Sequence, residues 1–278
     1  MKASISEIST PAASFTDDLG AYAAAGCTGI GIWEFKLGDD RAGREALRAS
    51  GLVATNCVPA VPLILPAPGF EEPAEPEARI EAIERSIRRL AALEPDCVLC
   101  LTGPAGDRDE AEARRIVLEG LRRLADAAEA AGVRCGLEPV HSTQRKLFSF
   151  VTSIPEALAL LDEVGRPSLG IMFDTYHLWD TATVYEDVAQ HLDRFTGVHV
   201  ADWRRPTRGP SDRVLPGDGV ADLVRLLGAL DRAGWAGFYD IEIFSDVALP
   251  DSLWQLDARE LAPRAVAALE SVWEARAV

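Results

Sequence analysis

The residues best suited to chemistry are acidic and histidine side chains that close apolar runs in the second half of the chain. These runs are typical of buried strands, and the polar residues at their ends are Glu138, Asp174, His199 and Glu242. A carboxylate embedded in an apolar strand is costly unless a partner stabilises its charge. Three carboxylates that converge on one point also repel each other strongly. A divalent metal ion resolves this conflict, because all three groups can bind the same cation.

Each of these residues has a simpler interpretation when it is considered alone. Asp174 precedes Thr175 and could cap a helix, and His199 lies between two valines and could be a hydrogen-bonded core histidine. The four residues together, on successive strands with apolar flanks, favour a metal site. An oxygen-rich ligand set with one imidazole suits Mn²⁺, Mg²⁺ or Co²⁺ better than a metal that prefers thiolates. We therefore predict one divalent metal ion of this kind as the cofactor.

Strand ends meet at one place only if their strands lie side by side in one sheet. Short runs rich in Val, Ile and Cys alternate along the chain with longer amphipathic segments, which predicts a parallel sheet covered by helices. The expected strands are Ala3–Ile8, Gly29–Glu34, Val53–Val58, Cys97–Thr102, Cys135–Pro139, Leu169–Asp174, Gly197–Val200 and Phe238–Ile243. The expected helices are Asp17–Ala25, Arg41–Ser50, Glu77–Ala92, Asp107–Ala131, Ile154–Val164, Val184–Leu192, Val220–Ala233 and Asp257–Ala275.

Two architectures accommodate eight such units, an open doubly wound sheet and a closed (β/α)8 barrel. An open dinucleotide-binding sheet carries G-x-G-x-x-G in its first strand–helix turn, whereas Ser9–Ser14 contains no glycine. The sequence therefore favours a single (β/α)8 TIM barrel domain over residues 1–278. Chemistry is then expected where the strands end. Pro66–Glu75 and Arg204–Gly219 are expected to form long loops at this end.

The composition disfavours several classes of partner. The chain has 278 residues, 28 basic and 44 acidic, for a net charge of −16. Nucleic acids and anionic membranes attract basic faces, so we expect neither as a partner. The first residues contain no apolar stretch of signal-peptide length, and the five cysteines lie mostly in apolar runs. We therefore predict a cytoplasmic protein with reduced thiols. Cys97 and Cys100 are three apart in a strand, which favours core packing over a redox or zinc site.

The motifs Asp174-Thr-Tyr-His177 and His199-Val-Ala-Asp202, the second followed by Arg205, resemble those of the xylose isomerase-like superfamily of sugar isomerases and epimerases. Ketose 3-epimerases and hydroxypyruvate isomerases of this superfamily are TIM barrels that bind one divalent ion through a Glu–Asp–His–Glu quartet. The resemblance covers essentially the whole chain. It implies that His177 and Arg205 bind substrate oxygens.

The same resemblance assigns roles to the four strand-end residues. It implies that the metal ligands are Glu138, Asp174, His199 and Glu242. In the epimerases the two glutamates also transfer the proton, so Glu138 and Glu242 are the expected catalytic pair. The chemistry is proton abstraction beside a carbonyl through a metal-stabilised enediolate. We therefore predict a divalent-metal-dependent sugar isomerase/epimerase.

The chain also departs from the family pattern. Gln144 replaces a glutamate that epimerases usually carry six residues after the first metal glutamate. His141 is a candidate substrate-site residue and could be an extra general acid or base, or else an exposed loop residue. Glu34 and Lys36 match no subgroup. These differences keep two alternatives open: a metal-dependent dehydratase or lyase acting on a keto-sugar, keto-cyclitol or 3-keto-glycoside, and a non-catalytic sugar-binding or accessory barrel subunit.

Aromatic and basic residues near the strand ends have two interpretations. The aromatic side chains could stack on a sugar or pack in the core or against a second subunit; they are Trp33, Trp179, Trp203 and Phe244. Of these, Trp33 is the substrate-binding candidate. The arginines of Arg204–Gly219 are expected to be solvated rather than to form an anion site. We expect a homo-oligomer whose other partner is a small-molecule sugar or keto-sugar.

Overall fold

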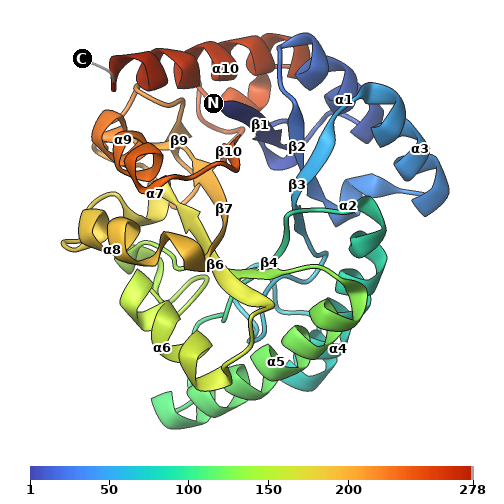
Figure 1. The fold of residues 1–278 in the computed structure, drawn as a ribbon, viewed down its shortest axis with the longest axis vertical. Helices are drawn as coiled ribbons and strands as arrows, with labels where there is room; N and C mark the ends of the chain where they lie inside the picture. Colours follow the sequence, from blue (N-terminus) through green and yellow to red (C-terminus); the bar gives the residue numbers. More distant parts are fainter. Residues whose placement is uncertain (277–278) are drawn as a thin grey trace.

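Residues 1–276 of the chain are described by a computed structural model, in which eight parallel strands close into a barrel. The strands are β1 (Lys2–Ser6), β2 (Gly29–Trp33), β3 (Val53–Val58), β4 (Cys97–Cys100), β5 (Cys135–Leu137), β6 (Leu169–Asp174), β7 (Phe195–Val200) and β10 (Phe238–Ile241). Each strand pairs with the next one in the barrel, and β10 closes the ring against β1. Figure 1 shows this ring enclosed by helices. The predicted (β/α)8 TIM barrel is confirmed.

The outer layer consists of one long helix after each barrel strand. These helices are α1 (Phe15–Ala24), α3 (Asp40–Ser50), α4 (Pro76–Leu90), α5 (Glu110–Ala131), α6 (Ile154–Val164), α8 (Val184–His191), α9 (Leu223–Ala233) and α10 (Ala258–Ala275). All eight were expected, and their starts differ most where an aspartate caps the helix. Asp109 accepts the N–H of Glu112 (2.8 Å) and Asp222 that of Arg225 (3.1 Å), so α5 and α9 begin three residues later than predicted.

The ends of the barrel strands depart from the prediction in a way that matters for the site. The first strand stops at Ser6, and Glu7–Ser9 forms a short 3-10 helix, because the carbonyl of Glu7 accepts the N–H of Thr10 and closes a turn. Strands β5 and β10 are also shorter than expected, so Glu138 and Glu242 are the first residues after each strand. Two short helices, α2 (Glu34–Leu37) and α7 (Thr175–Leu178), start directly after β2 and β6.

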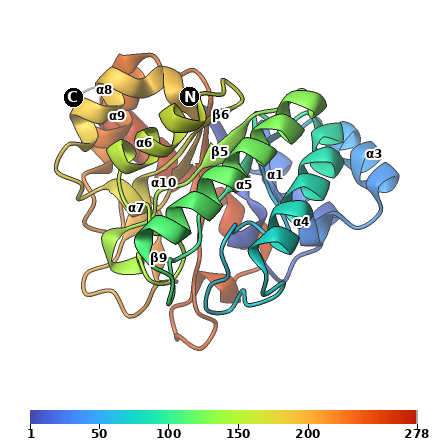
Figure 2. The same cartoon turned by 90° about the horizontal axis from the view of Figure 1, so that it is seen from below.

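The long loops extend from the same end of the barrel, as Figure 2 shows for the cyan segment after β3 and the orange to red segments after β7 and β10. Part of Arg204–Gly219 is ordered as a small antiparallel pair of strands, β8 (Asp202–Trp203) and β9 (Arg213–Val214). Asp202 fixes this loop by accepting the N–H groups of Gly217 and Ala221 (both 3.0 Å). At Gly219, a Cβ atom would lie 2.3 Å from Oδ1 of Asp202, so only glycine allows this close approach.

The core has an inner and an outer part, as a barrel requires. Inside the barrel, Cys97 packs with Val58, Leu99 and Met172, whereas Cys100 belongs to the larger core between strands and helices. The two cysteines therefore point to opposite faces of β4, as predicted. All five cysteines are free and buried, and burial raises the pKa of Cys97 and Cys100 to about 12.

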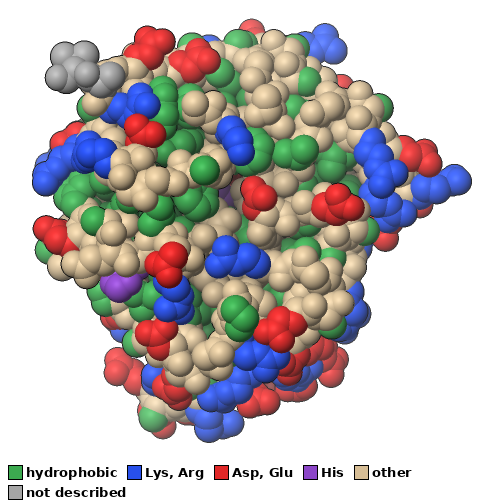
Figure 3. Space-filling view, in the orientation of Figure 1, with side chains coloured by type: hydrophobic (Ala, Val, Ile, Leu, Met, Phe, Trp, Pro, Cys, Tyr) green, Lys and Arg blue, Asp and Glu red, His purple; other side chains and the backbone are tan. Residues whose placement is uncertain are grey.

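Acidic and basic side chains are interspersed on the surface. On the face shown in Figure 3, basic side chains alternate with acidic ones around the edge, and no extended basic patch forms. Within residues 1–276 we find no helix with the length and apolar character needed to cross a bilayer.

Candidate functional site

The four predicted ligand residues come together at the carboxyl end of the barrel. Each offers one oxygen or nitrogen atom, these atoms lie within 4.8 Å of one another, and all four side chains are buried. They come from neighbouring strands of one arc, in the order β10, β7, β6, β5. Parallel strands place their carboxyl ends at the same rim, which is why residues more than 100 positions apart converge. The four residues, which could hold a metal ion, are Glu138, Asp174, His199 and Glu242.

The imidazole of His199 faces the carboxylates through Nδ1. This atom lies 2.9 Å from Oε1 of Glu138 and 3.4 Å from Oε2 of Glu242. Burial lowers the pKa of His199, but the carboxylates of Glu242 and Glu138 outweigh it and raise the pKa to about 10. Burial likewise raises the pKa of Glu138 to about 7, despite the nearby imidazole. The two carboxylates therefore favour the protonated imidazole of His199, while burial favours the protonated form of Glu138.

Arg213, on β9, enters the same centre. Its Nη1 atom lies 2.8 Å from Oδ2 of Asp174 and 3.2 Å from Oε2 of Glu242, and the side chain is only 4% exposed. The guanidinium carbon lies 4.4 Å from the ring centroid of Tyr176 and 5.0 Å from that of Phe244. The expectation that the loop arginines are solvated is therefore wrong for Arg213, because the β8–β9 pairing turns it into the barrel.

The other arginines of this loop lie away from the quartet, and two of them pair with carboxylates. Arg204 and Arg208 both bind Asp212 and Asp251. Arg205, the substrate-binding candidate, is exposed, and its guanidinium carbon lies 5.7 Å from the ring centroid of Trp179. Arg205 does not line the pocket above the quartet. Its predicted role stays a prediction, and Arg213 is the arginine that this structure brings to the ligands.

The charge of this centre suits a divalent cation. The carboxylates of Glu138, Asp174 and Glu242 face a single permanently charged guanidinium, that of Arg213. Two negative charges remain when His199 is neutral, as a ligand must be. Three carboxylates and one imidazole, all buried, also match the donor set that hard divalent ions prefer. The residues present therefore fit a single divalent ion.

The predicted substrate residue His177 points into the site with a defined tautomer. The backbone N–H of His141 donates to its Nδ1 (3.1 Å), so the proton of the neutral ring is on Nε2. Nε2 lies 3.7 Å from Oδ2 of Asp174, beside Arg213. Burial holds the pKa of His177 at about 3, so the ring stays neutral. His177 thus presents a hydrogen-bond donor to the centre.

His141 lies behind His177 rather than in the pocket. It is 4% exposed, its Nε2 is 3.2 Å from Oδ2 of Asp180, and its ring centroid is 4.2 Å from that of Trp203. The interpretation of His141 as an exposed loop residue is therefore wrong. Its backbone fixes the tautomer of His177, and no part of it lines the pocket above the quartet.

A cavity of about 430 Å³ opens directly above the quartet. Trp33, a predicted substrate-binding residue, lines this cavity, and so does Gln144; the role of Trp33 stays a prediction. The predicted loop Pro66–Glu75 contributes Phe70. The lining residues are Ile8, Trp33, Phe35, Val58, Pro59, Ala60, Pro62, Leu63, Phe70, Leu99, Leu101, Glu138, Val140, Gln144, Phe148, His177, Pro210, Ser211, Arg213, Glu242, Phe244 and Trp254.

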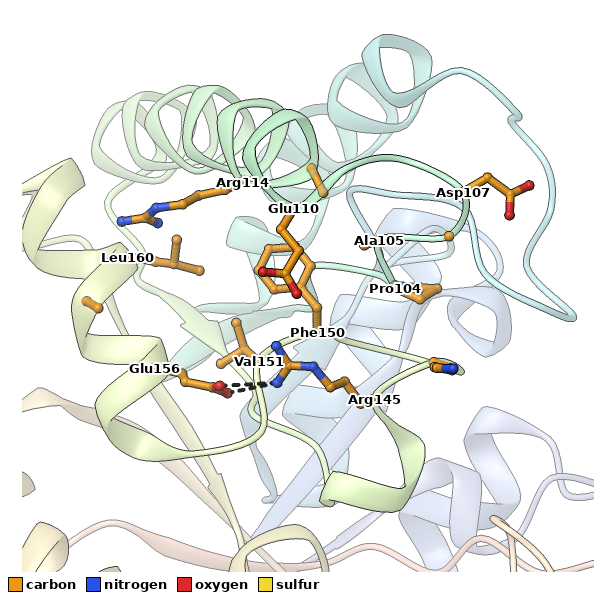
Figure 4. Close-up of a pocket in the computed structure, with 14 residues that line it drawn as sticks. Pro104, Ala105, Asp107, Glu110, Arg114, Arg145, Phe150, Val151, Glu156 and Leu160 are labelled. Atoms are coloured by element: carbon orange, nitrogen blue, oxygen red, sulfur yellow. Dashed lines mark hydrogen bonds and ion pairs between the residues drawn. The ribbon is translucent and has the colours of Figure 1, made fainter.

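A larger pocket, of about 660 Å³, lies between α5 and α6 and contains none of the quartet. Figure 4 shows the ion pair between Arg145 and Glu156 at its edge and Phe150 and Val151 in its wall. Both charged side chains are more than 40% exposed, so their pair is weak. This pocket is the larger of the two, but the buried titratable side chains line the smaller cavity, which is therefore the candidate active site.

Glu34 and Lys36 support the wall of the barrel instead of the site. Glu34 accepts the backbone N–H of Ala60 (2.8 Å) and the hydroxyl of Ser86 (2.5 Å). The ammonium group of Lys36 forms a buried ion pair with Asp18 and also donates to the carbonyl of Thr10 (3.0 Å). Both residues therefore connect loops at this end, and neither lines the cavity above the quartet.

The sequence analysis missed Asp240, which lies beneath the quartet. Its Oδ2 atom is 3.7 Å from Nε2 of His199 and accepts from the amide of Asn56 (2.8 Å). A Cβ atom on Gly31 would lie 2.4 Å from this oxygen, so the glycine makes room for it. The signal was present in the sequence, because Asp240 and Glu242 both fall in the predicted strand Phe238–Ile243, where residues two apart point to the same face.

Comparisons with known proteins agree with this geometry. The family model described as xylose isomerase-like TIM barrel matches residues 19–271. A ketose 3-epimerase of Arthrobacter globiformis is 31% identical over 131 residues, which are 46% of this chain and 42% of the relative. An inosose isomerase of Bacillus velezensis is 30% identical over 48% of each chain. A 3-dehydroshikimate dehydratase of Pseudomonas putida is 25% identical over 88% of this chain and 38% of the relative.

A solved structure from Sinorhizobium meliloti superposes with a TM-score of 0.87 at 27% identity and covers 97% of this chain and 98% of its own. The chain matches less than half the length of each of the three curated relatives. The match to the family model covers most of the barrel, including all four strand-end residues. The chain therefore belongs to the xylose isomerase-like TIM barrel family.

Proposed function

We propose that this chain is a divalent-metal-dependent isomerase or epimerase of a sugar or keto-cyclitol. The observation that carries the proposal is the buried quartet of three carboxylates and one imidazole at the carboxyl end of the barrel. Three buried carboxylates are costly for a fold to keep without a function. The curated relatives include a ketose 3-epimerase and an inosose isomerase, which supports this class of reaction.

The four ligands proposed for the metal are Glu138, Asp174, His199 and Glu242, and this oxygen-rich set favours Mn²⁺, Mg²⁺ or Co²⁺. When bound, a divalent ion would polarise a ketone carbonyl and so acidify the neighbouring C–H bond.

The proton transfer is assigned to the two glutamates. Glu138 and Glu242 follow the outer strands of the four-strand arc, with Asp174 and His199 between them. One carboxylate removes the proton beside the carbonyl and the other returns it. Return to the opposite face epimerises that carbon, and return to the neighbouring carbon interconverts aldose and ketose.

Arg213 and His177 are the proposed groups that hold substrate oxygens. Both line the cavity and both present N–H donors next to the ligand carboxylates. The neutral His177 donates through Nε2, and Arg213 supplies a fixed positive charge near an oxygen that gains negative charge. Asp240 is proposed to orient His199 by accepting from its Nε2–H, as second carboxylates commonly do for metal-bound histidines.

A dehydratase or lyase is the second candidate function. The relative that aligns with 88% of this chain is a 3-dehydroshikimate dehydratase. The same proton abstraction followed by loss of a β-substituent gives elimination, and it needs a donor for the leaving group. Gln144 lies at the cavity wall in place of the family glutamate. This difference at the cavity wall is why elimination of a β-substituent stays open beside return of the proton.

The test compares the exchange of a substrate proton with solvent deuterium in the metal-free and the metal-loaded protein. The chain is stripped of metal, reconstituted separately with Mn²⁺, Mg²⁺ or Co²⁺, and incubated in D₂O with ketoses, keto-cyclitols and 3-keto-glycosides. We expect deuterium to enter the carbon beside the carbonyl only in the reconstituted protein, with an epimer or isomer as product by NMR. The control is Asp246→Asn, which removes an exposed carboxylate outside the quartet and should leave the metal-dependent exchange unchanged. Exchange that persists without metal would contradict the proposal, and loss of water or of an aglycone would select the second candidate.

A further inference from the structure

The cavity above the quartet is polar at one end only. Sixteen of its 22 lining residues are apolar. Four of the six polar ones belong to the centre: Glu138, Glu242, His177 and Arg213. Only Gln144 and Ser211 remain for the rest of a ligand, and the amide nitrogen of Gln144 already faces the carbonyl of Pro210 at 3.4 Å.

A free sugar fits such a cavity poorly. It carries a hydroxyl on nearly every carbon, and each hydroxyl that is buried without a partner costs about 1–3 kcal/mol. The tryptophan side chains do not supply the missing partners. The indole N–H of Trp33 donates to Oγ of Ser6 (2.9 Å) and that of Trp254 to the carbonyl of Ile243 (2.9 Å). Both indoles therefore offer only apolar surface to a ligand.

Aromatic rings form a continuous wall from the polar end to the solvent. Arg213 lies 5.0 Å from the ring centroid of Phe244, and the centroids of Phe244 and Trp33 are 5.8 Å apart. The centroids of Trp33 and Phe35 follow at 5.9 Å. Phe35 is 58% exposed and Phe70, at another part of the cavity wall, is 37% exposed. Within residues 1–276 these two are the only aromatic side chains among the exposed large hydrophobic residues.

We infer that the substrate of this site is a keto-sugar that carries an aromatic aglycone. The α-hydroxyketone part lies at the quartet, beside Arg213 and His177, and the aglycone lies along the aromatic wall toward Phe35. The cavity volume of about 430 Å³ is within the roughly 300–1,000 Å³ of pockets that bury drug-sized ligands. The inference rests on the proposed function, since it assumes that the ketone binds at the quartet.

The experiment compares two probes with the same ketone. The metal-loaded full chain is titrated calorimetrically with phenyl 3-keto-β-D-glucoside and with free 3-keto-D-glucose. We expect the phenyl glycoside to bind at least about tenfold more tightly, because packing against one aromatic side chain contributes roughly two- to twelvefold and the wall has three, Phe244, Trp33 and Phe35. Equal or tighter binding of the free keto-sugar would overturn the inference and leave the proposed function intact.

A variant at the exposed end locates the aglycone. Phe35→Ser removes the exposed ring at the end of the aromatic wall, so the fold is retained, and it should weaken the phenyl glycoside roughly two- to twelvefold while leaving free 3-keto-D-glucose unchanged. Val247→Ser is the matched control, since Val247 is 61% exposed and lies outside the cavity. Equal weakening of both probes would also overturn the inference. So would a change in sedimentation coefficient without a change in affinity, which would show that Phe35 covers a second subunit.

The two possible failures remain distinguishable because metal binding is measured first. A protein that binds Mn²⁺ but neither probe, and that exchanges no substrate proton, contradicts the proposed function and the inference with it. A protein that exchanges protons of free keto-sugars with no gain from an aglycone contradicts the inference alone.

Discussion

Replacing Arg213 with methionine should destabilise the metal-free protein strongly. The guanidinium lies 2.8 Å from Oδ2 of Asp174 and 3.2 Å from Oε2 of Glu242, and all three side chains are at most 4% exposed. At an effective dielectric constant of about 20, each charge pair at ~4 Å contributes about 4 kcal/mol. Desolvation of the guanidinium offsets part of this. Removing one partner from a buried pair typically costs 3–5 kcal/mol, because the other charge stays buried without compensation. We expect Arg213→Met to lose about this amount.

A divalent ion should reverse much of the loss. Once Arg213 is removed, the bound ion is the only positive charge beside the three carboxylates, because His199 is neutral as a ligand. The variant therefore gains more from metal than the wild type does. The measurement is urea-induced unfolding of both proteins, with EDTA and with saturating Mn²⁺. We expect a difference of about 3–5 kcal/mol in EDTA that narrows clearly in Mn²⁺.

The matched control is Arg166→Met. Arg166 also pairs with two carboxylates, those of Asp126 and Glu129, but its side chain is 38% exposed. Exposed pairs of this kind contribute about 0–1 kcal/mol. If Arg213→Met loses no more stability in EDTA than Arg166→Met, the buried charge argument is wrong. If the loss is large but Mn²⁺ does not reduce it, the quartet does not bind the ion.

Three further predictions concern other parts of the centre and its surroundings. Glu242→Gln should remain folded and still bind metal with modestly reduced affinity, while turnover of an accepted substrate falls by about 10²–10⁴-fold. Wild-type turnover of the metal-loaded variant would show that Glu242 is a ligand only. Deuterium exchange of the substrate that survives in Glu242→Gln but not in Glu138→Gln would assign the first proton abstraction to Glu138. Asp240→Asn should weaken Mn²⁺ binding about 10–100-fold with little change in the unfolding free energy in EDTA; calorimetry that gives the wild-type dissociation constant would remove Asp240 as the residue that orients His199. Burial raises the pKa of Glu7 from 4.5 to about 8 in the folded protein, despite Lys36, so its protonated form stabilises the fold fully below about pH 4.5 and this stabilisation is lost as the pH rises toward 8. The wild type should therefore lose stability relative to Glu7→Gln, whose side chain does not titrate, by at most about 1.4 kcal/mol per pH unit between pH 5 and 8. Urea unfolding measures the free-energy difference between the two proteins, and a difference that stays constant over this range would contradict the raised pKa of Glu7.

The sequence was most informative where a strand ends. A polar residue that closes an apolar run can be located from local pattern alone, and in a parallel barrel all such ends lie at one rim. Glu138, Asp174, His199 and Glu242 were therefore predictable as neighbours without any knowledge of a contact between them. The boundaries of the runs were less accurate, since Glu138 and Glu242 follow their strands instead of ending them. This shift did not move either side chain away from the rim.

Loop residues were less predictable because no repeat fixes where they point. Arg205 follows His199 at the family spacing, yet it is exposed beside Trp179. Arg213 is eight residues further along the same loop and reaches the ligands, because β8 and β9 pair and turn its side chain inward. His141 was open to two interpretations, and its burial between Asp180 and Trp203 depends on residues about 40 and 60 positions away.

The sequence by itself determined the barrel and the four polar residues that meet at its rim, because both depend on a local pattern repeated at a fixed spacing. The tertiary structure decided which arginine compensates the quartet, which tautomer His177 adopts, and that the cavity is polar at one end and aromatic at the other. These features depend on contacts between segments far apart in the chain. Their energies come from burial and from the distance between charges, and neither quantity exists until the segments have packed together.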